Sequence, residues 1–125
     1  MVDLPTKASG TRRVWSDSSG RLWVSEWNTG TLSVYDPQQK RWRTWRLPGE
    51  EPHTYAVCVD EKNKVWVSDF SANAILSFDP QTEKFESFPS TRERANVRQM
   101  AGRAGEAWGA ESGTDRLVVV RYGRR

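Results

Sequence analysis

Two residues near the middle of the chain have side chains that could take part in catalysis or metal binding. His53 is the only histidine among the 125 residues, and Glu51 stands two positions before it. Side chains at i and i+2 of an extended segment point to the same side, and Pro52 between them fixes φ and donates no hydrogen bond to a sheet. Such a carboxylate–imidazole pair could bind a metal, could move a proton, or could be a solvated loop without a chemical role.

The single cysteine, Cys58, lies inside a predicted apolar strand. One thiol cannot form an internal disulfide, so no oxidising compartment is indicated, and we expect Cys58 to be a small buried apolar residue. No run of apolar residues approaches the length of a membrane span, and the N-terminus has no apolar signal region. These observations favour a cytoplasmic protein without a membrane partner.

Length and charge narrow the class of protein further. A chain of 125 residues forms one domain at most. The formal net charge is +3, and the basic residues at 40–46 and at Arg124-Arg125 do not form a like-charge block long enough for a nucleic-acid-binding arm. We therefore expect no nucleic acid among the partners.

An internal repeat organises the chain. The segment Arg21–Glu26, which contains Trp23, recurs 43 residues later around Trp66, and a third copy begins around Trp108, 42 residues after Trp66. The repeats consist of short apolar segments between turn residues, and no stretch shows helical periodicity. The pattern predicts an all-β protein in which Trp23, Trp66 and Trp108 pack in the core or between repeats.

Each repeat divides into short predicted strands. They lie at 14–17, 21–26, 31–36 and 41–46 in the first copy, at 55–60, 64–69, 74–79 and 84–88 in the second, and at 97–101, 107–111 and 117–121 in the third. Four antiparallel strands in about 40–45 residues is the spacing of a β-propeller blade. The sequence therefore predicts about three four-stranded antiparallel blades, approximately 12–48, 55–90 and 96–122, the last lacking its outer strand.

The predicted propeller is incomplete. Propellers have roughly four to eight blades, and three blades leave apolar faces and sheet edges open. We therefore interpret residues 12–125 as a partial β-propeller, the C-terminal part of a longer one, and residues 1–11 as the tail of a preceding blade or a disordered end. The alternative is self-association, in which two chains complete one ring.

Topology predicts which loops meet. In a four-stranded meander, the loop before the first strand and the loop between the second and third strands lie at the same end of the sheet. The segment 51–53 should therefore share a face with 26–28, 69–71 and 93–96, and functional residues often lie on such loops. The candidate ligand-face residues are Glu26, Trp27, Asp69, Phe70 and Arg98.

Turn formation is the alternative role for several of these residues. Asn28 and Asn73 are turn residues that tolerate a positive φ. Glu26 and Asp69 could cap hairpins or pair with arginine.

Three segments of the chain resemble the streptogramin B lyases, the family of virginiamycin B lyase. They are 24–28, 66–73 and Glu51-Pro52-His53, which precedes an inner strand in that family as it does here. The resemblance extends over about residues 12–122 and is specific at the level of the repeat. Only the Glu-Pro-His segment of this resemblance bears on function, because the blade pattern is common to many propellers.

This resemblance implies a propeller enzyme that opens the lactone of type B streptogramins by elimination, with Mg²⁺. A base removes a proton α to a carbonyl, a metal stabilises the enolate that develops, and the carboxylate oxygen leaves. Carried over by position, His53 would be the catalytic acid/base, and Glu51 would be the second site residue, near the metal. The implied partner is a small cyclic ester.

The chain also departs from the family. The family has a histidine at the equivalent place one blade earlier, where this chain has Gly10, and the position one repeat after His53 is Ala95, although Glu93 retains a carboxylate. The segments 96–100 and 111–115 differ from the lyase pattern as well. We therefore expect a separate branch whose substrate need not be an antibiotic.

Two principal hypotheses follow from these observations. The first is a lyase-like propeller acting on a cyclic ester with Mg²⁺. The second is a non-catalytic propeller that binds a small ligand or a protein on the same face through Trp27, Phe70 and Arg98. A metal-dependent lactone hydrolase is a lesser third hypothesis.

Overall fold

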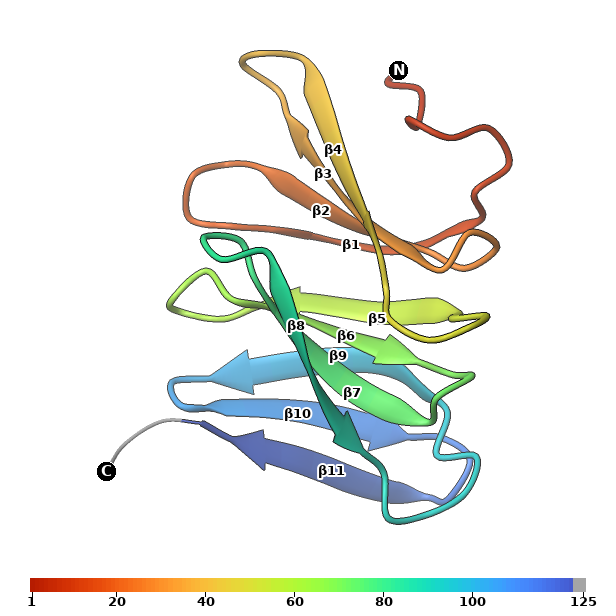
Figure 1. The fold of residues 1–125 in the computed structure, drawn as a ribbon. Coiled ribbons are helices and arrows are strands. Elements are labelled where there is room, and N and C mark those ends of the chain that lie inside the picture. The colour runs from red at the N-terminus through yellow and green to blue at the C-terminus, as the bar shows by residue number, and fades with distance from the viewer. Residues whose placement is uncertain (123–125) are drawn as a thin grey trace.

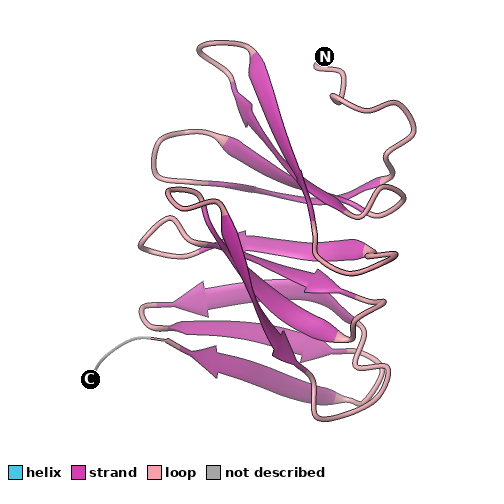
Figure 2. Cartoon of the chain, in the orientation of Figure 1, coloured by secondary structure: helices cyan, strands magenta, loops and turns pink. Residues whose placement is uncertain are grey.

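The computed structural model describes residues 1–122, and within that range it contains eleven β-strands and no helix (Figure 2). The strands are β1 (Thr11–Ser16), β2 (Leu22–Glu26), β3 (Thr31–Asp36), β4 (Arg41–Arg46), β5 (Thr54–Val59), β6 (Val65–Asp69), β7 (Ala74–Asp79), β8 (Lys84–Pro89), β9 (Val97–Arg103), β10 (Glu106–Glu111) and β11 (Arg116–Arg121). Residues 123–125, which end the predicted domain and include the basic Arg124-Arg125 pair, lie outside the described residues. No helix in the described range is long and apolar enough to span a membrane.

The strands form three antiparallel sheets that stack one upon another (Figure 1). Blade 1 is β1-β2-β3-β4, blade 2 is β5-β6-β7-β8, and blade 3 is β9-β10-β11. Each sheet is a meander in which neighbouring strands pair, as short turns between consecutive strands require. The sheets do not close into a ring, and within the described residues blade 3 has no fourth strand. The predicted all-β, incomplete propeller is confirmed.

The strand bounds agree with the prediction to within a few residues. The largest differences are in the inner strands: β1 begins at Thr11 rather than Val14, and β9 ends at Arg103 rather than Ala101. Both extensions lie in polar residues without the alternation that marks a strand in sequence. Backbone pairing in the sheet, rather than side-chain pattern, sets these ends.

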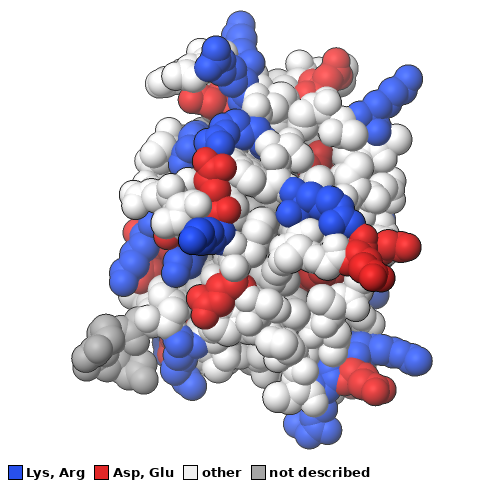
Figure 3. Space-filling view, in the orientation of Figure 1, with Lys and Arg blue, Asp and Glu red and all other residues white. Residues whose placement is uncertain are grey.

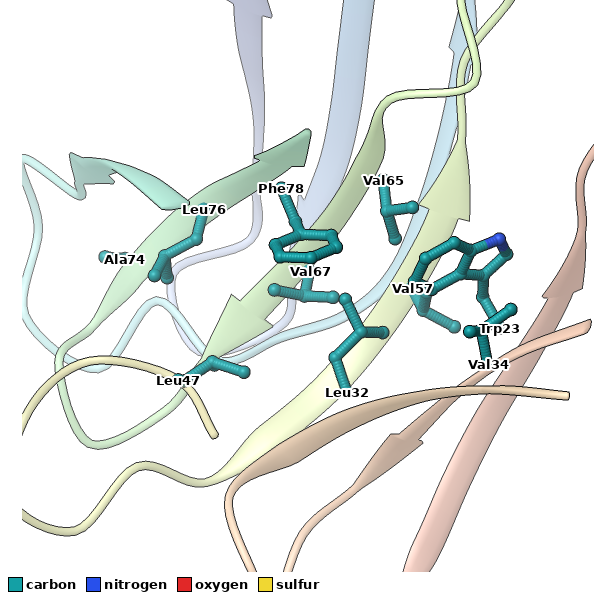
Figure 4. Packing of buried hydrophobic residues seen from close by; sticks show 10 residues of the cluster. All are labelled: Trp23, Leu32, Val34, Leu47, Val57, Val65, Val67, Ala74, Leu76 and Phe78. Atoms are coloured by element: carbon teal, nitrogen blue, oxygen red, sulfur yellow. The ribbon is translucent and has the colours of Figure 1, made fainter. Parts of the chain in front are cut away.

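Two clusters of buried apolar side chains hold the blades together. The cluster between blades 1 and 2 is shown in Figure 4 and contains Trp23, Leu32, Val34, Leu47, Val57, Val65, Val67, Ala74, Leu76 and Phe78. The cluster between blades 2 and 3 contains Ala56, Cys58, Trp66, Ile75, Val97, Met100 and Ala107. The prediction for Cys58 is confirmed: its side chain is buried, and burial raises the pKa of the thiol to about 12, with a further contribution from Asp60.

The predicted role in the core or between blades is confirmed for two of the three equivalent tryptophans and stays a prediction for the third. Trp23 and Trp66 are fully buried, and their indole N–H groups donate to Asp17 and Asp60 respectively, each at 2.9 Å. Trp108 is only half-buried and belongs to neither cluster. Successive side chains of a strand point to opposite faces. Because its neighbours on β10 pack against blade 2, Trp108 lies on the opposite face of blade 3.

Each inner strand contains a β-bulge at the same place, close to its first residue. The register shifts between Thr11 and Val14 in β1, between Thr54 and Val57 in β5, and between Val97 and Met100 in β9. In each case two residues of the inner strand oppose one residue of the second strand. The bulge pairs and their opposing residues are Arg12 and Arg13 opposite Ser25, Tyr55 and Ala56 opposite Ser68, and Arg98 and Gln99 opposite Ala110.

Serine side chains connect each bulge to the next blade. Ser25 Oγ accepts from the Arg13 N–H at 3.0 Å and donates to the Tyr55 carbonyl of blade 2 at 2.5 Å. Ser68 Oγ repeats this arrangement one blade later, accepting from Ala56 N at 2.9 Å and donating to the Val97 carbonyl at 2.6 Å. One hydroxyl thus satisfies a donor left over by the bulge and fixes the neighbouring inner strand.

Candidate functional site

The loops predicted to share a face do meet, at the end of the blades on the right of Figure 1. The loop before each inner strand is hydrogen-bonded to the loop that follows the second strand of the same blade. Phe70 N donates to the His53 carbonyl at 3.0 Å, Trp27 N to the Gly10 carbonyl at 2.8 Å, and Gly113 N to the Ala95 carbonyl at 3.0 Å. We refer to this end as the loop face. Its loops contain residues 27–30, 47–53, 70–73, 90–96 and 112–115.

His53 is held on the loop face by contacts on two sides. Its Nδ1 lies 2.5 Å from Ser71 Oγ, and its ring centroid lies 4.8 Å from that of Trp27. The main-chain N–H of His53 donates to Asp69 Oδ1 at 3.0 Å, which fixes the backbone as well. Because Nδ1 has a partner, Nε2 is the ring nitrogen left to exchange a proton with a ligand.

Four aromatic rings form one group around Trp27. His53 lies on one side, Phe70 packs edge-on at 5.1 Å, and Tyr55 packs edge-on at 5.8 Å. Tyr55 and Phe70 also stack on each other at 5.1 Å with an interplanar angle of 18°. All four residues are half-buried, so the group is held in place while part of each side chain stays exposed. We call these four residues the aromatic group.

Three arginines border the aromatic group. The guanidinium carbon of Arg12 lies 5.4 Å from the Trp27 ring centroid, that of Arg13 lies 5.1 Å from Tyr55, and that of Arg98 lies 5.7 Å from Phe70. The bulges explain this convergence, because neighbouring residues of a regular strand point to opposite faces, whereas Arg12 and Arg13 both reach Tyr55. Arg13 Nε also donates to Gln99 Oε1 at 3.1 Å, which joins blade 1 to blade 3.

The pairing of Glu51 with His53 stays a prediction. No hydrogen bond or ion pair joins these two described residues, and Glu51 lines a hollow of about 380 Å³ together with Ser71 and Ala72. The i, i+2 rule does not apply, because β5 begins only at Thr54 and the preceding segment is a bend. Pro52 is buried, and its carbonyl lies so close to Gly30 that a Cβ there would be 2.3 Å from the oxygen.

The structure places Glu26 and Asp69 at the loop face but buries their side chains. Glu26 is 0% exposed and accepts hydrogen bonds from the hydroxyls of Thr31, at 2.7 Å, and Ser33. Asp69 is 2% exposed and accepts from the main-chain N–H of Ser71 at 2.9 Å as well as from that of His53. Neither carboxylate is presented to a ligand, and Asp69 has the turn-capping role considered as the alternative.

Gly10 stands where the resemblance to the lyases would place a second histidine, and a larger residue does not fit there readily. Its φ is +75°, a left-handed conformation that glycine adopts without strain. A Cβ at this position would lie 2.7 Å from the side-chain nitrogen of Asn28, which donates to the Ala8 carbonyl at 3.0 Å. The Asn28 side chain therefore fills the space that a larger residue would need.

The described residues place one exposed carboxylate close in sequence to His53 but contain no group of three metal-ligating side chains. Mg²⁺ takes octahedral oxygen coordination and is bound through one or two carboxylates together with water and substrate. Glu51 is the exposed carboxylate nearest in sequence to His53, but within residues 1–122 no three His, Cys, Asp or Glu side chains are grouped so that they could hold a metal. Glu93, the other retained carboxylate, is an exposed loop residue.

Several residues of the site were not singled out by the sequence. Tyr55, Arg12, Arg13 and Gln99 lie on inner strands, and their orientation depends on the bulges. Tyr55 did carry one signal, because it stands two positions after His53. Arg12 and Arg13 carried none, since only the register of β1 brings them to the loop face.

Fold and loop face together define the class: these are three blades of a β-propeller with an aromatic and cationic surface at one end. Among solved structures, a catalytically inactive His-to-Ala variant of virginiamycin B lyase from Staphylococcus aureus, with quinupristin, superimposes with a TM-score of 0.84 at 14% identity, covering 97% of this chain and 43% of that one. A streptogramin B lyase matches with a TM-score of 0.77 at 18% identity, covering 87% of this chain and 36% of that one.

The same fold recurs in propellers of other kinds. The WD40 repeats of RRP9 superimpose with a TM-score of 0.64 at 8% identity, covering 86% of this chain and 36% of that one. No family model and no curated protein matches the sequence. At these identities the likeness shows the fold, and this chain spans less than half the length of the lyases that it matches.

Proposed function

We propose that this chain contributes part of a streptogramin B lyase-type site, in which His53 acts as the acid/base that opens a cyclic ester. The observation that carries the proposal is the fixed imidazole on the loop face, with Nδ1 beside Ser71 Oγ and the ring against Trp27. The superposition on two lyase structures supports it. In the variant of one of these structures a single histidine-to-alanine change leaves the enzyme catalytically inactive, which is the behaviour we expect of His53.

The proposed reaction needs a base but no water. His53 Nε2 takes a proton from a carbon α to a carbonyl, and the electron pair of that C–H bond forms a double bond to the neighbouring carbon. The bond from that carbon to the ester oxygen breaks, and its electrons remain on the carboxylate that leaves. The aromatic group offers apolar surface to the ring of the ester and excludes water from one side of it.

Mg²⁺ is a separate part of the proposal, and no step above depends on it. Glu51 is the carboxylate that we propose near such an ion, with remaining ligands from substrate, water or blades beyond this chain. We likewise propose that further blades, or a second copy of the chain, complete the ring. Light scattering coupled to size-exclusion chromatography measures the molar mass of the protein in solution. A monomer would contradict the alternative in which a second copy completes the ring.

A turnover assay with mass spectrometry tests the reaction. The chain is incubated with a type B streptogramin, with and without Mg²⁺, and the product is analysed. We expect a linear product of unchanged mass, whereas a hydrolase would give a product heavier by one water. His53→Ala should reduce the rate about 10²–10⁴-fold, the usual contribution of a general base, and Gln38→Ala, an exposed turn residue between β3 and β4, should leave it unchanged. A rate unaffected by His53→Ala would refute the proposed role.

Ligand binding without turnover is the second candidate function. The exposed aromatic group with Arg12, Arg13 and Arg98 at its border favours it. Binding of an intact streptogramin to the wild-type chain and to His53→Ala with equal affinity, and with no product from either, would support this function over the lyase.

A further inference from the structure

The three arginines of the loop face differ from the other arginines that lie over aromatic rings. Elsewhere in the described chain, Arg21 lies over Trp23 and Arg43 lies over Trp45. Each of these two also pairs with a carboxylate, Arg21 with Asp17 at 3.0 Å and Arg43 with Glu83 at 2.7 Å. In these two cases the arginine that lies over a ring therefore has an anion beside it.

Arg12, Arg13 and Arg98 have no such partner. None of the three takes part in any ion pair of residues 1–122. Their side-chain polar contacts are with neutral groups: Arg13 donates to the Gln99 side chain and to the Arg12 carbonyl, and Arg98 donates to the Ser112 hydroxyl at 2.6 Å. The two carboxylates nearest in sequence to the aromatic group, Glu26 and Asp69, are buried and accept hydrogen bonds from neutral donors of their own loops and strands.

The result is three positive charges around one exposed group of rings, and none of the three is paired with a carboxylate within residues 1–122. Figure 3 shows that on the face in view acidic and basic side chains are interspersed. Guanidinium groups bind carboxylates through paired hydrogen bonds, and the rings of Trp27, Tyr55 and Phe70 offer stacking surface to a flat group. The hydrogen bond to Gln99 already restricts the Arg13 side chain, so less conformational entropy is lost when a ligand binds.

We propose that this surface binds an aromatic carboxylate, with the ring on the aromatic group and the carboxylate among Arg12, Arg13 and Arg98. The inference rests on the proposed function and extends it: the elimination releases a carboxylate, and these arginines would hold that end of the opened product. The ligand class is therefore a planar, apolar ring that carries or acquires one negative charge.

Calorimetric titration with a matched pair of probes tests the inference. The probes are 2-naphthoate and its neutral isostere 2-naphthamide, titrated into the full chain at low ionic strength. A charge-assisted hydrogen bond contributes more than a neutral one, so we expect naphthoate to bind roughly tenfold more tightly than naphthamide. Raising the salt concentration should weaken the binding of naphthoate and leave that of naphthamide nearly unchanged.

Substitutions locate the site. Arg12→Gln and Arg98→Gln alter exposed side chains, so both variants should fold as the wild type does. Each should weaken naphthoate binding several-fold and leave naphthamide binding unchanged. Arg43→Gln is the control, because Arg43 also stacks on a tryptophan but lies on β4, outside the loop face, and it should change neither affinity.

The outcomes separate this inference from the proposed function. If the chain prefers naphthoate through Arg12 and Arg98 but never opens a streptogramin, the anion site stands and the lyase proposal fails. If turnover depends on His53 but the two probes bind equally, or neither binds, the anion site is wrong. Equal losses in Arg98→Gln and Arg43→Gln would also overturn it, since the effect would then reflect net charge.

Discussion

Equivalent strands build the two interfaces between blades, but they fill them differently. Between blades 1 and 2, Trp23 stacks on Trp45 at 5.8 Å, and both rings contact Phe78. At the matching place between blades 2 and 3, the Phe78 position is Val120, 42 residues later, and the residues equivalent to Val65 and Leu76 are Ala107 and Val118. At these three positions the second interface thus carries smaller side chains, while Tyr122 supplies a ring elsewhere, stacked on Trp66 at 5.2 Å.

A hollow of about 400 Å³ lies where the smaller side chains meet. Ile75, Phe88, Val118 and Val120 line it, together with polar residues of the loop face such as Asn73. Backbone pairing and the serine contacts are nearly the same at both interfaces, so the repeat of main-chain hydrogen bonds does not require full packing. The comparison indicates that the repeat specifies the fold, and we expect side-chain volume to set the stability of each interface.

The largest effect should come from removing the ring at the centre of the first interface. Phe78 is fully buried among three other rings, and Phe78→Ala should lower the free energy of unfolding by about 3–5 kcal/mol. Val120→Ala removes two methyl groups from a half-buried side chain and should cost less than about 2 kcal/mol. Urea unfolding measures both, and equal losses would show that the interfaces are equally packed.

The serine contacts should respond alike at the two interfaces. Ser25→Ala and Ser68→Ala each leave a main-chain N–H of the bulge and a carbonyl of the next blade without their hydroxyl partner. We expect each change to cost about 1–3 kcal/mol. Ser87→Ala, at an exposed position on β8, is the control and should cost little. A loss at Ser25 alone would mean that the contact at Ser68 contributes nothing to the second interface.

Filling the hollow should strengthen the second interface. Val120→Phe places at this position the residue that occupies it in blade 2, and we expect a gain of about 0.5–2 kcal/mol in the free energy of unfolding. Gly109→Val likewise introduces the residue found at the equivalent position of blade 2, Val67. It should nevertheless lower the free energy of unfolding, because a Cβ at Gly109 would lie 2.8 Å from Val97 Cγ1. If the hollow lies beside Val120 and not beside Gly109, the unfolding temperature should rise for Val120→Phe and fall for Gly109→Val.

Acid should have the smallest effect and should act on blade 3 through Glu106. Hydrogen bonds from Arg103, Trp108 and Arg121 lower the pKa of this carboxyl to about 2. Because the folded pKa lies below the unfolded value, the contribution to stability is complete above about pH 4.5 and is lost as the pH falls towards 2. Both arginines are more than half exposed, so solvent weakens the pairs.

A variant and a pH series measure this contribution. The difference in unfolding free energy between the wild type and Glu106→Gln should be constant near neutral pH and should shrink between about pH 4.5 and 2. In blade 1, burial alone would raise the pKa of Asp17, but hydrogen bonds from Trp23 and from the main chain of Arg21 and Ser19 outweigh it and lower the pKa. Asp17→Asn should therefore show the same direction of change, and a difference that grows towards low pH would contradict the assignment in either blade.

The repeat made most of the fold predictable. Recurrence of the tryptophan segment at 43 and 42 residues, with turns between, was enough to place eleven strands and to expect open ends. The burial of Cys58 followed from its apolar neighbours. What the repeat could not show was packing volume, because Phe78 and Val120 are both apolar and fit the same pattern.

The candidate site was less predictable, because its residues are positioned by changes of strand register that the sequence does not show. His53, Trp27, Phe70 and Arg98 could be placed on one face by topology, and they do lie there. Pairing Glu51 with His53 assumed an extended chain where the structure has a bend. Arg12 and Arg13 reach the loop face only because a bulge in β1 places both of them opposite one residue of β2, Ser25. The alternation of apolar and polar residues in the sequence does not reveal this change of register.

The three bulges also bear on how such a surface can diversify. Their exposed or half-buried residues, Arg12, Arg13, Tyr55, Arg98 and Gln99, stand where the regular ladder is interrupted, while the serines and core residues that join the blades lie elsewhere. Exchange of these few side chains would alter what the surface recognises at little cost to the scaffold. A library randomised at these positions would therefore sample new specificities while most of its members still fold.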